Sequence, residues 1–215
     1  MWKKLTRRSG PFRSADYWQE RYRSGRGSGA GSIGRLAAYK ADFVNDLVSG
    51  QGIASVIEFG MGDGDQASLF RFPDYTGLDI VPQVVANARK RFADRPGWRF
   101  ETLAEYRAAP SQRDLALSLD VIYHLVEDEV FADYMTLLVA AAGRFLLVYS
   151  SDREAAGGAG HVRHRAYSAW MAANAPAFAV AGSWENPFAL AEGGDPQVSS
   201  FAHFRLYQRR AEGAR

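Results

Sequence analysis

The chain has 215 residues, 47% of them hydrophobic, which suits one folded domain with a substantial core. Its 26 basic and 24 acidic residues give a net charge of +2, a balance that argues against nucleic-acid binding by the domain as a whole. The absence of cysteine excludes disulfides, thiolate metal sites and cysteine nucleophiles. There is no apolar run that could cross a membrane and no secretory signal, so we expect a cytoplasmic protein without a membrane partner.

The N-terminal fifty residues are expected to form a helical cap with a loop. The segment SADYWQERYR, residues 14–23, favours a helix, and residues 24–34, SGRGSGAGSIG, contain too much glycine for one. We interpret this loop as either a flexible linker or a clasp of closely packed backbone. Residues 35–50 have apolar positions near a 3.6-residue period and end at a glycine, which predicts an amphipathic helix. We therefore divide the chain into a cap, residues 1–50, and a main domain, residues 51–215.

Strand and helix patterns alternate through the main domain. The alternation predicts a doubly wound α/β sheet, mostly parallel, with helices on both faces and its ligand site at the carboxyl ends of the strands. Two closing strands without a full crossover helix between them indicate an antiparallel pair at one edge. The predicted strands are residues 54–59, 75–80, 98–103, 114–121, 144–151, 178–186 and 200–210. The predicted helices are residues 65–72, 82–92, 128–142 and 166–175.

The first strand of the main domain ends in a glycine-rich turn, VIEFGMGDG, residues 56–64. A phosphate-binding P-loop needs a lysine and then a serine or threonine after its last glycine, but Asp65 and Gln66 stand there. A dinucleotide-binding turn has the spacing G-x-G-x-x-G, whereas these glycines follow G-x-G-x-G. The turn therefore fits neither of these phosphate-binding patterns.

Carboxylates surround the same turn. Glu58, Asp63 and Asp65 lie in or beside it, and Asp79 ends the next predicted strand. Three acids at a helix N-terminus would oppose a pyrophosphate and would suit a ligand with an ammonium or sulfonium group. A carboxylate at the position of Asp79 can accept hydrogen bonds from both hydroxyls of a ribose. A ribose, a cationic amino-acid tail and no phosphate together describe S-adenosylmethionine (SAM).

Three segments resemble the class I SAM-dependent methyltransferases. Residues 56–64 resemble the first motif of that family, E/D-x-G-x-G-x-G, residues 75–80 (YTGLDI) its second-strand motif, and residues 114–128 (DLALSLDVIYHLVED) its fourth-strand motif. The resemblance implies a Rossmann-like sheet of seven strands with a reversed last strand, methyltransferase activity, and S-adenosyl-L-methionine as the methyl donor.

The resemblance also implies which residues hold the donor. The glycines would let the backbone pass close under it, Glu58 would lie beneath it, and Asp79 would bind the ribose. Ile80 would lie beside the adenine and Asp120 near the methionine moiety, while no acid of the third strand is assigned. The candidate donor-binding residues are Glu58, Gly60, Gly62, Asp63, Gly64, Gln66, Asp79, Ile80 and Asp120.

The catalytic candidates are Asp120, His124 and His161. Methyl transfer to an oxygen usually requires removal of its proton, which histidine can perform near neutral pH. His124 follows Asp120 by four residues and could be this base or could make a structural hydrogen bond. A divalent metal held by these three residues and Asp152 is an alternative, but no ligand spacing supports it, and we predict no metal site.

A second candidate for the acceptor site is the segment GHVRHRAYSAW, residues 160–170, which follows a glycine-rich loop that could act as a lid. It is either a charged surface turn or a wall of the acceptor site, in which Arg163, His164 and Arg165 would bind the substrate. 

Four residues of the N-terminal region are further candidates. Trp18 and Tyr22 could cover the donor or belong to the core, and Arg35 or Lys40 could pair with the donor carboxylate or lie on a solvated helix face.

Together these features predict a SAM-dependent methyltransferase of a small molecule, with an oxygen of a hydroxylated or sugar-like compound as acceptor. One alternative is N-methylation of a protein or nucleic acid, although residues 118–125 (SLDVIYHL) lack the [D/N]-P-P-[Y/F] motif of many amide and base methyltransferases. The other alternative is a SAM-binding partner protein without turnover. A homodimer through residues 131–143 stays open, since that helix could equally belong to the core.

Overall fold

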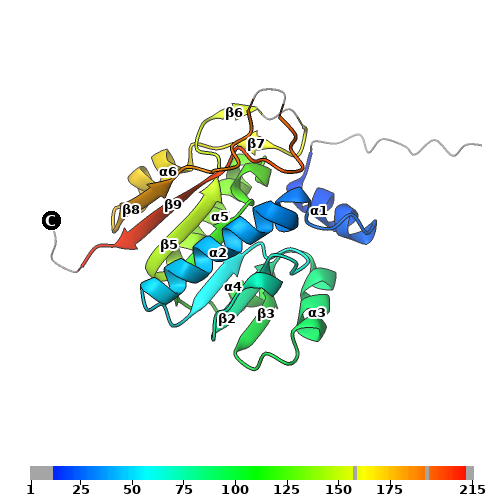
Figure 1. The fold of residues 1–215 in the computed structure, drawn as a ribbon, viewed down its shortest axis with the longest axis horizontal. Coiled ribbons are helices and arrows are strands. Elements are labelled where there is room, and N and C mark those ends of the chain that lie inside the picture. The colour runs from blue at the N-terminus through cyan, green and yellow to red at the C-terminus, as the bar shows by residue number, and fades with distance from the viewer. Residues whose placement is uncertain (1–11, 157–158, 192–193, 212–215) are drawn as a thin grey trace, which may run out of the picture.

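The computed structural model describes residues 12–156, 159–191 and 194–211, so part of the expected cap, residues 1–11, and part of the expected lid, residues 157–158, lie outside the described residues. Figure 1 shows the arrangement of its helices and strands. The helices are α1 (Ser14–Arg23), α2 (Gly34–Gly50), α3 (Pro82–Arg91), α4 (Leu103–Ala108), α5 (Asp128–Ala141) and α6 (Tyr167–Asn174), with short 3₁₀ turns η1 (Ala30–Ser32), η2 (Ala67–Leu69) and η3 (Ile122–His124). The strands are β1 (Val56–Phe59), β2 (Tyr75–Asp79), β3 (Trp98–Thr102), β4 (Arg113–Leu119), β5 (Ala142–Ser150), β6 (Ala155–Ala156), β7 (Arg163–His164), β8 (Phe178–Trp184) and β9 (His203–Arg209).

The central sheet has seven strands in the order β3-β2-β1-β4-β5-β9-β8. The pairs β3/β2, β2/β1, β1/β4 and β4/β5 are parallel, and β9 runs antiparallel to both of its neighbours, β5 and β8. This confirms the expected mostly parallel sheet with a reversed last strand. The strand order changes direction between β1 and β4, and such a switch point opens a crevice at the carboxyl ends of the strands.

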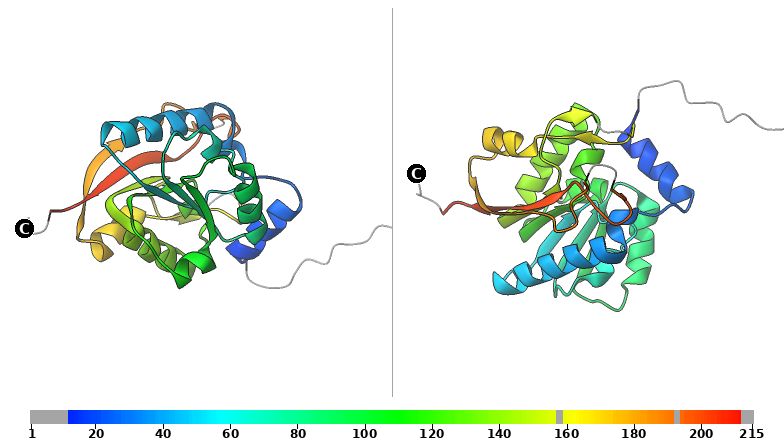
Figure 2. Two further views of the ribbon diagram at one scale, coloured as in Figure 1. Left: turned by 90° about the horizontal axis from the view of Figure 1, so that it is seen from below. Right: turned by 45° about the horizontal axis from the view of Figure 1, so that its top comes forward.

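Helices cover both faces of the sheet, as Figure 2 shows. One face packs against α2 and α3 through a core that includes Val44 and Val85, and the other packs against α4, α5 and α6 through a core that includes Tyr106, Met135 and Met171. Strand β1, in the middle of the sheet, is buried on both faces, which explains why its sequence is a nearly continuous apolar run rather than an alternating one. The buried side of α5 belongs to the second core, so that side does not serve as an external interface.

The chain differs from the sequence prediction between β1 and β2. The helix expected over residues 65–72 is reduced to the single turn η2. The side chain of Asn45 on α2 donates to the Leu69 carbonyl at 3.0 Å and accepts from the Arg71 amide at 2.9 Å. Because this side chain satisfies backbone groups that a helix would otherwise pair, the segment can stay irregular while it buries Phe70 and Phe72.

The glycine- and serine-rich loop, residues 24–34, is a clasp on the glycine turn rather than a linker. The Ser28 amide donates to Asp63 Oδ2 at 2.6 Å, and the Asp63 amide donates to Ser28 Oγ at 3.0 Å. Ser28 Oγ also shares a hydrogen bond of 3.0 Å with the Tyr22 hydroxyl of α1. We call residues 24–34 the clasp, and it fixes α1 over the end of the sheet.

Within the described part of the chain, none of the helices combines the length and apolarity required to span a membrane.

Candidate functional site

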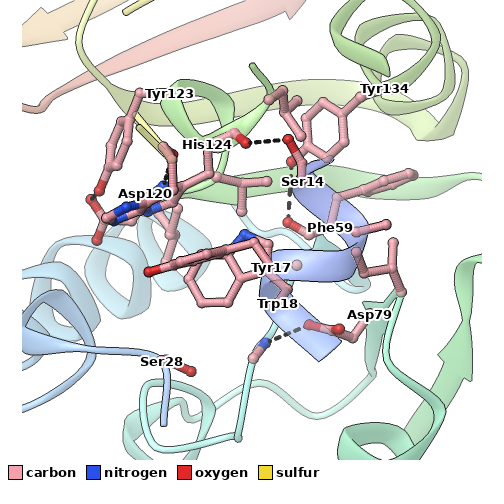
Figure 3. A pocket seen from close by; sticks show the side chains of 18 of the residues that line it. Ser14, Tyr17, Trp18, Ser28, Phe59, Asp79, Asp120, Tyr123, His124 and Tyr134 are labelled. Atoms are coloured by element: carbon pink, nitrogen blue, oxygen red, sulfur yellow. Dashed lines mark hydrogen bonds between the residues drawn. The ribbon is translucent and has the colours of Figure 1, made fainter. Parts of the chain in front are cut away.

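A cavity of about 950 Å³ lies at the carboxyl ends of β1, β2 and β4, beneath α1. Figure 3 shows side chains from α1, β2 and the segment after β4 directed into it. The predicted site residues that line this cavity are Glu58, Gly60, Gly62, Gln66, Asp79, Ile80, Asp120, His124 and His161, joined by Trp18, Tyr22 and Lys40. The predicted residues that do not line it are Asp63, Gly64, Arg163, His164, Arg165 and Arg35.

The three glycines of the turn all have left-handed backbone conformations, with φ of 84° at Gly60, 62° at Gly62 and 82° at Gly64. Side-chain-bearing residues rarely adopt this conformation, so the turn requires glycine for its shape. A Cβ on Gly62 would also overlap Ser28 Oγ of the clasp, and one on Gly60 would press on Val121. The turn is therefore glycine-rich because the backbone bends sharply and the clasp approaches it closely.

Asp79 ends β2 at the edge of the cavity, with 8% of its surface exposed. Its oxygens accept hydrogen bonds from the Gly62 amide at 3.1 Å, which Figure 3 shows, and from the Val81 amide at 2.9 Å. Burial raises the pKa of this carboxyl to about 6, against the opposing effect of the backbone amides. A carboxylate oxygen can accept more than one hydrogen bond, so Asp79 retains capacity for a ligand hydroxyl.

Glu58 lies deeper, on β1, and is fully enclosed. The Tyr75 hydroxyl donates to its Oε2. Burial raises the pKa of Glu58 to about 7, while the Tyr75 hydrogen bond and the nearby ammonium of Lys40 oppose that rise. Glu58 lies below the glycine turn, and its negative charge therefore depends on pH near neutrality.

Lys40 and Asp120 form a buried ion pair at the centre of the site. Lys40, on α2, is 1% exposed and its ammonium donates to Asp120 Oδ2. The Tyr123 hydroxyl donates to the other carboxylate oxygen at 2.8 Å, as Figure 3 shows. Asp120 has a φ of 60°, the one positive value at a non-glycine position among the described residues. Such strained backbone is typical of functional sites, because surrounding contacts must hold it in place.

Gln66 lines the cavity and carries a buried acceptor that is unpaired. Its Nε2 donates to the Ala37 carbonyl at 3.1 Å, but its Oε1 is buried and has no hydrogen-bond partner. A buried acceptor without a partner is costly, so a donor group on a ligand would stabilise it.

His124 faces the cavity in a defined tautomer. Its Nδ1 lies 3.0 Å from the carbonyl oxygen of His161. Because a carbonyl can only accept, Nδ1 carries the proton and the lone pair is on Nε2. Burial lowers the pKa of His124 to about 4, so the ring is neutral at pH 7.

Aromatic side chains surround the two histidines. The His161 ring stacks on Tyr17 of α1 at 4.5 Å between centroids, and on His124 at 5.4 Å. Trp18 meets His124 edge-on at 5.0 Å. The structure therefore brings both candidate histidines together with two rings of α1.

Arg163, His164 and Arg165 lie outside the cavity and bind neighbouring chain segments. Arg165 is buried, and its guanidinium donates to the carbonyls of residues 125 and 126 and to Asp128. Arg163 pairs with Asp128 and with Glu154. His164 lies 2.7 Å from Ser151 Oγ and 3.1 Å from the Arg153 guanidinium. The two arginines hold the loop after β4 in place, whereas His164 contacts the segment after β5. The interpretation of these three residues as a substrate wall has no support in their geometry.

No protein-family model matches the sequence, and no curated protein matches it. Solved structures do match. The magnesium protoporphyrin IX methyltransferase (ChlM) of Synechocystis PCC 6803 with bound SAH has a TM-score of 0.62 at 16% identity, over 91% of this chain and 98% of that chain. N-methyltransferase NodS of Bradyrhizobium japonicum WM9, in complex with S-adenosyl-L-homocysteine (SAH), has a TM-score of 0.62 at 13% identity, over 82% and 88%. An O-methyltransferase family protein of Burkholderia thailandensis has a TM-score of 0.59 at 16% identity, over 84% of this chain and 57% of that chain.

The chain has the Rossmann-like methyltransferase fold. Its structural neighbours include one protein named as an N-methyltransferase and one of an O-methyltransferase family, so the methyltransferase fold alone leaves the acceptor atom open.

Two residues that sequence reasoning did not select attach α1 to this methyltransferase fold. The Ser14 amide donates to Glu127 Oε1 at 2.8 Å, and the Ser14 hydroxyl donates to the His124 carbonyl at 2.9 Å. Ser14 and Glu127 are 113 residues apart, and no local pattern marks either of them. Their contact could be found only once the fold brought α1 to the segment after β4.

A metal site was considered for Asp120, His124, His161 and Asp152. The structure places Asp152 away from the other three, in an ion pair with Arg205. Across residues 12–156, 159–191 and 194–211, no group of three or more histidine, cysteine or acidic side chains is arranged to hold a metal ion.

Proposed function

We propose that the protein is a SAM-dependent methyltransferase that acts on an oxygen of a small hydroxylated molecule. The observation that carries this proposal is the gathering of the glycine turn, Asp79 and Asp120 around one cavity in the methyltransferase fold. Structural neighbours of that fold were solved with SAM or SAH.

The residues of the cavity fit the chemistry of this donor. Asp79 offers a carboxylate to a ribose, and Ile80, 40% exposed, offers an apolar surface to an adenine. Gln66 Oε1 offers its unpaired acceptor to an ammonium group. Lys40 and Asp120 carry the charges that complement the carboxylate and the ammonium of an amino-acid tail. SAM supplies an electrophilic methyl group on a sulfonium.

His124 is proposed as the group that receives the acceptor proton. Its Nδ1 is held by the His161 carbonyl, so the lone pair of Nε2 is available for a hydroxyl in the cavity. The base must lie within hydrogen-bonding reach of the proton that it removes, and His124 lines the same cavity as Asp120. The two histidines therefore have different proposed roles. His124 acts through its ring nitrogen, and His161 positions the His124 ring through a backbone carbonyl.

The covered position of the cavity supports a small acceptor. Helix α1 lies over the site and is attached through Ser14 to Glu127 and through the clasp to the glycine turn. A folded protein or a duplex would require this helix to move away, whereas a small molecule can occupy the space beside Asp120.

The donor half of the proposal is tested by isothermal titration calorimetry with SAH. We expect SAH to bind and NAD and ATP not to bind. Asp79→Asn should lower the affinity for SAH by roughly 10- to 100-fold, because it removes charge-assisted hydrogen bonds. Asp74→Asn is the matched control, since Asp74 precedes the same strand but pairs with Arg99 on the surface. NAD or ATP binding as tightly as SAH would refute the donor assignment.

A further inference from the structure

We propose that the acceptor is a planar aromatic compound with a ring hydroxyl, a phenol rather than a sugar. This inference rests on the proposed methyltransferase function and narrows its acceptor class. It comes from the side of the cavity around His124, where aromatic rings from separate segments adjoin one another.

The rings form a continuous series that we call the aromatic arc. Neighbouring rings within it lie between 4.5 and 5.9 Å apart, centroid to centroid. These spacings are typical of stacked or edge-on aromatic pairs, and the rings come from the segment just before α1, from α1, from the turn after β4 and from loops before β7 and β9. The members of the arc are Phe12, Tyr17, Trp18, Tyr123, His124, His161 and Phe201.

Both ends of the aromatic arc are open to a ligand. Phe12 is 37% exposed and Phe201 is 36% exposed, although both line the cavity. Exposed rings that border a cavity indicate a surface for an apolar partner. A flat aromatic molecule can stack on such rings.

Three polar groups of the arc are already engaged. The Tyr123 hydroxyl donates to Asp120, His124 Nδ1 donates to the His161 carbonyl, and the Tyr17 hydroxyl accepts from Arg21. A sugar ring carries several hydroxyls, and each buried hydroxyl needs a partner. Arg163 and Arg165, which the sequence predicted to bind the substrate, bind backbone carbonyls and Asp128 instead. The lone pair of His124 Nε2 can receive the proton of one hydroxyl, which is what a phenol carries.

The proton chemistry agrees with this choice. Burial lowers the pKa of His124 to about 4, which makes it a weak base. A phenol ionises near a pKa of about 10, against about 15.7 for water, so a phenolic proton is the easier one to remove. In the transfer, the phenolic oxygen gives its proton to His124 Nε2 and its electron pair forms the C–O bond to the methyl carbon. The C–S bond breaks with its electron pair left on sulfur, which becomes a neutral thioether.

The proposal is tested with four compounds, whose binding to protein saturated with SAH is measured by calorimetry. 2-Naphthol is planar and acidic, 2-naphthalenemethanol is planar but not acidic, decahydro-2-naphthol is neither, and methyl glucoside represents a sugar. We expect both naphthalene compounds to bind at least tenfold more tightly than the other two. With SAM in place of SAH, only 2-naphthol should be methylated. Equal or tighter binding of the glucoside, or its methylation, would overturn the proposal. Failure of SAH itself to bind would instead refute the donor assignment.

A matched pair of variants locates the binding surface. Phe201→Leu keeps an apolar side chain but removes the ring. It should lower the affinity for 2-naphthol by about 3- to 10-fold and leave the affinity for SAH unchanged. Trp184→Leu also removes a partly exposed ring, but Trp184 does not line the cavity, so its 2-naphthol affinity should be unchanged. Tyr17→Leu, at the other side of the arc, is a second variant in case Phe201→Leu does not fold. Unchanged 2-naphthol affinity in a folded arc variant would contradict the aromatic site.

Discussion

At the scale of single residues, Asp79 predicts how donor binding depends on pH. Burial raises its pKa from the ordinary 3.8 to about 6, so the carboxylate is ionised at pH 8 and protonated at pH 5. Ionisation is needed for it to accept two ribose hydroxyls. We therefore expect SAH affinity, measured by calorimetry, to fall up to tenfold per pH unit below about pH 6.

The control for this titration is Asp79→Asn, which should lack the step near pH 6. Glu58, with a pKa raised to about 7, could add a second step nearer neutrality, and the asparagine variant retains it. SAH affinity that is constant from pH 8 to pH 5 in the unmodified protein would contradict the assignment of Asp79 to the ribose.

The ion pair of Lys40 and Asp120 gives a second prediction at this scale. Lys40→Met leaves Asp120 without its cation in a largely buried position, and the loss of one member of such a pair costs about 3–5 kcal/mol of unfolding free energy. Lys40 also lowers the pKa of Glu58, so the variant should lose further stability as pH rises through about 7 and Glu58 ionises. Urea unfolding at pH 6 and pH 8 measures both effects.

The double variant Lys40→Met with Asp120→Asn is the informative control. Asparagine tolerates the left-handed conformation that Asp120 adopts, and it removes the unpaired charge. The double variant should therefore be more stable than Lys40→Met alone. If the two are equally stable, the cost comes from packing around the lysine rather than from the buried charge.

At the residue level, the sequence placed residues correctly where a local motif fixes their position. The spacing of Gly60, Gly62 and Asp79 placed them at the carboxyl ends of neighbouring strands, and the structure brings them to one cavity. It could not find Ser14 and Glu127, because a contact across 113 residues depends on the complete fold. It also could not tell that Arg165 is buried, since arginine in a polar segment reads equally well as exposed.

At the scale of elements, the contact between the glycine turn and the clasp predicts a difference between two glycine substitutions. Gly62→Ala and Gly52→Ala each place a side chain at similar left-handed φ angles, 62° and 56°. Both should lose about 1 kcal/mol of stability from backbone strain. Only at Gly62 would the new Cβ overlap Ser28 Oγ, because nothing lies within 4 Å of the corresponding position at Gly52.

We expect Gly62→Ala to displace the clasp and to lower the affinity for SAH by tenfold or more. Gly52→Ala should leave that affinity unchanged. Calorimetry measures the affinity, and hydrogen exchange of residues 24–34 reports whether the clasp has moved. Equal SAH affinity in both variants would show that the clasp does not contribute to the donor site.

Helices with a strong periodic pattern of apolar residues were predicted correctly, and those with a weak or short pattern were not. Residues 35–50 and 128–142 show a clear apolar face and form α2 and α5. The helix predicted over residues 65–72 was wrong, because Asn45 on α2 pairs the backbone there, and this tertiary contact leaves no trace in the local sequence. Helix α4 was missed because it has only six residues, although the capping box between Thr102 and Glu105 marks its start.

At the scale of the whole molecule, the methyltransferase fold explains why segments distant in sequence share one site. The strand order turns at β1 and β4, so the glycine turn and Asp120 meet across the crevice, and α1 returns over them from the N-terminal end of the chain. The reversed strand β9 brings the loop that carries Phe201 to the same cavity. Alternation of strand and helix patterns predicted the sheet, but not which loops would adjoin His124.

Donor binding to this assembled site should stabilise the entire fold. A ligand that binds only the native state at a concentration one hundred times its Kd adds about 2.7 kcal/mol of unfolding free energy. For a domain of this size, each kcal/mol raises the melting temperature by about 2–4 °C, so saturating SAH should raise it by about 5–10 °C. Differential scanning fluorimetry provides the measurement, with NAD and ATP as comparison ligands and Asp79→Asn as the variant expected to lose most of the shift. The carboxylates around the glycine turn should repel both phosphorylated nucleotides, so a comparable shift with either of them would mean that the cavity does not select a cationic nucleoside.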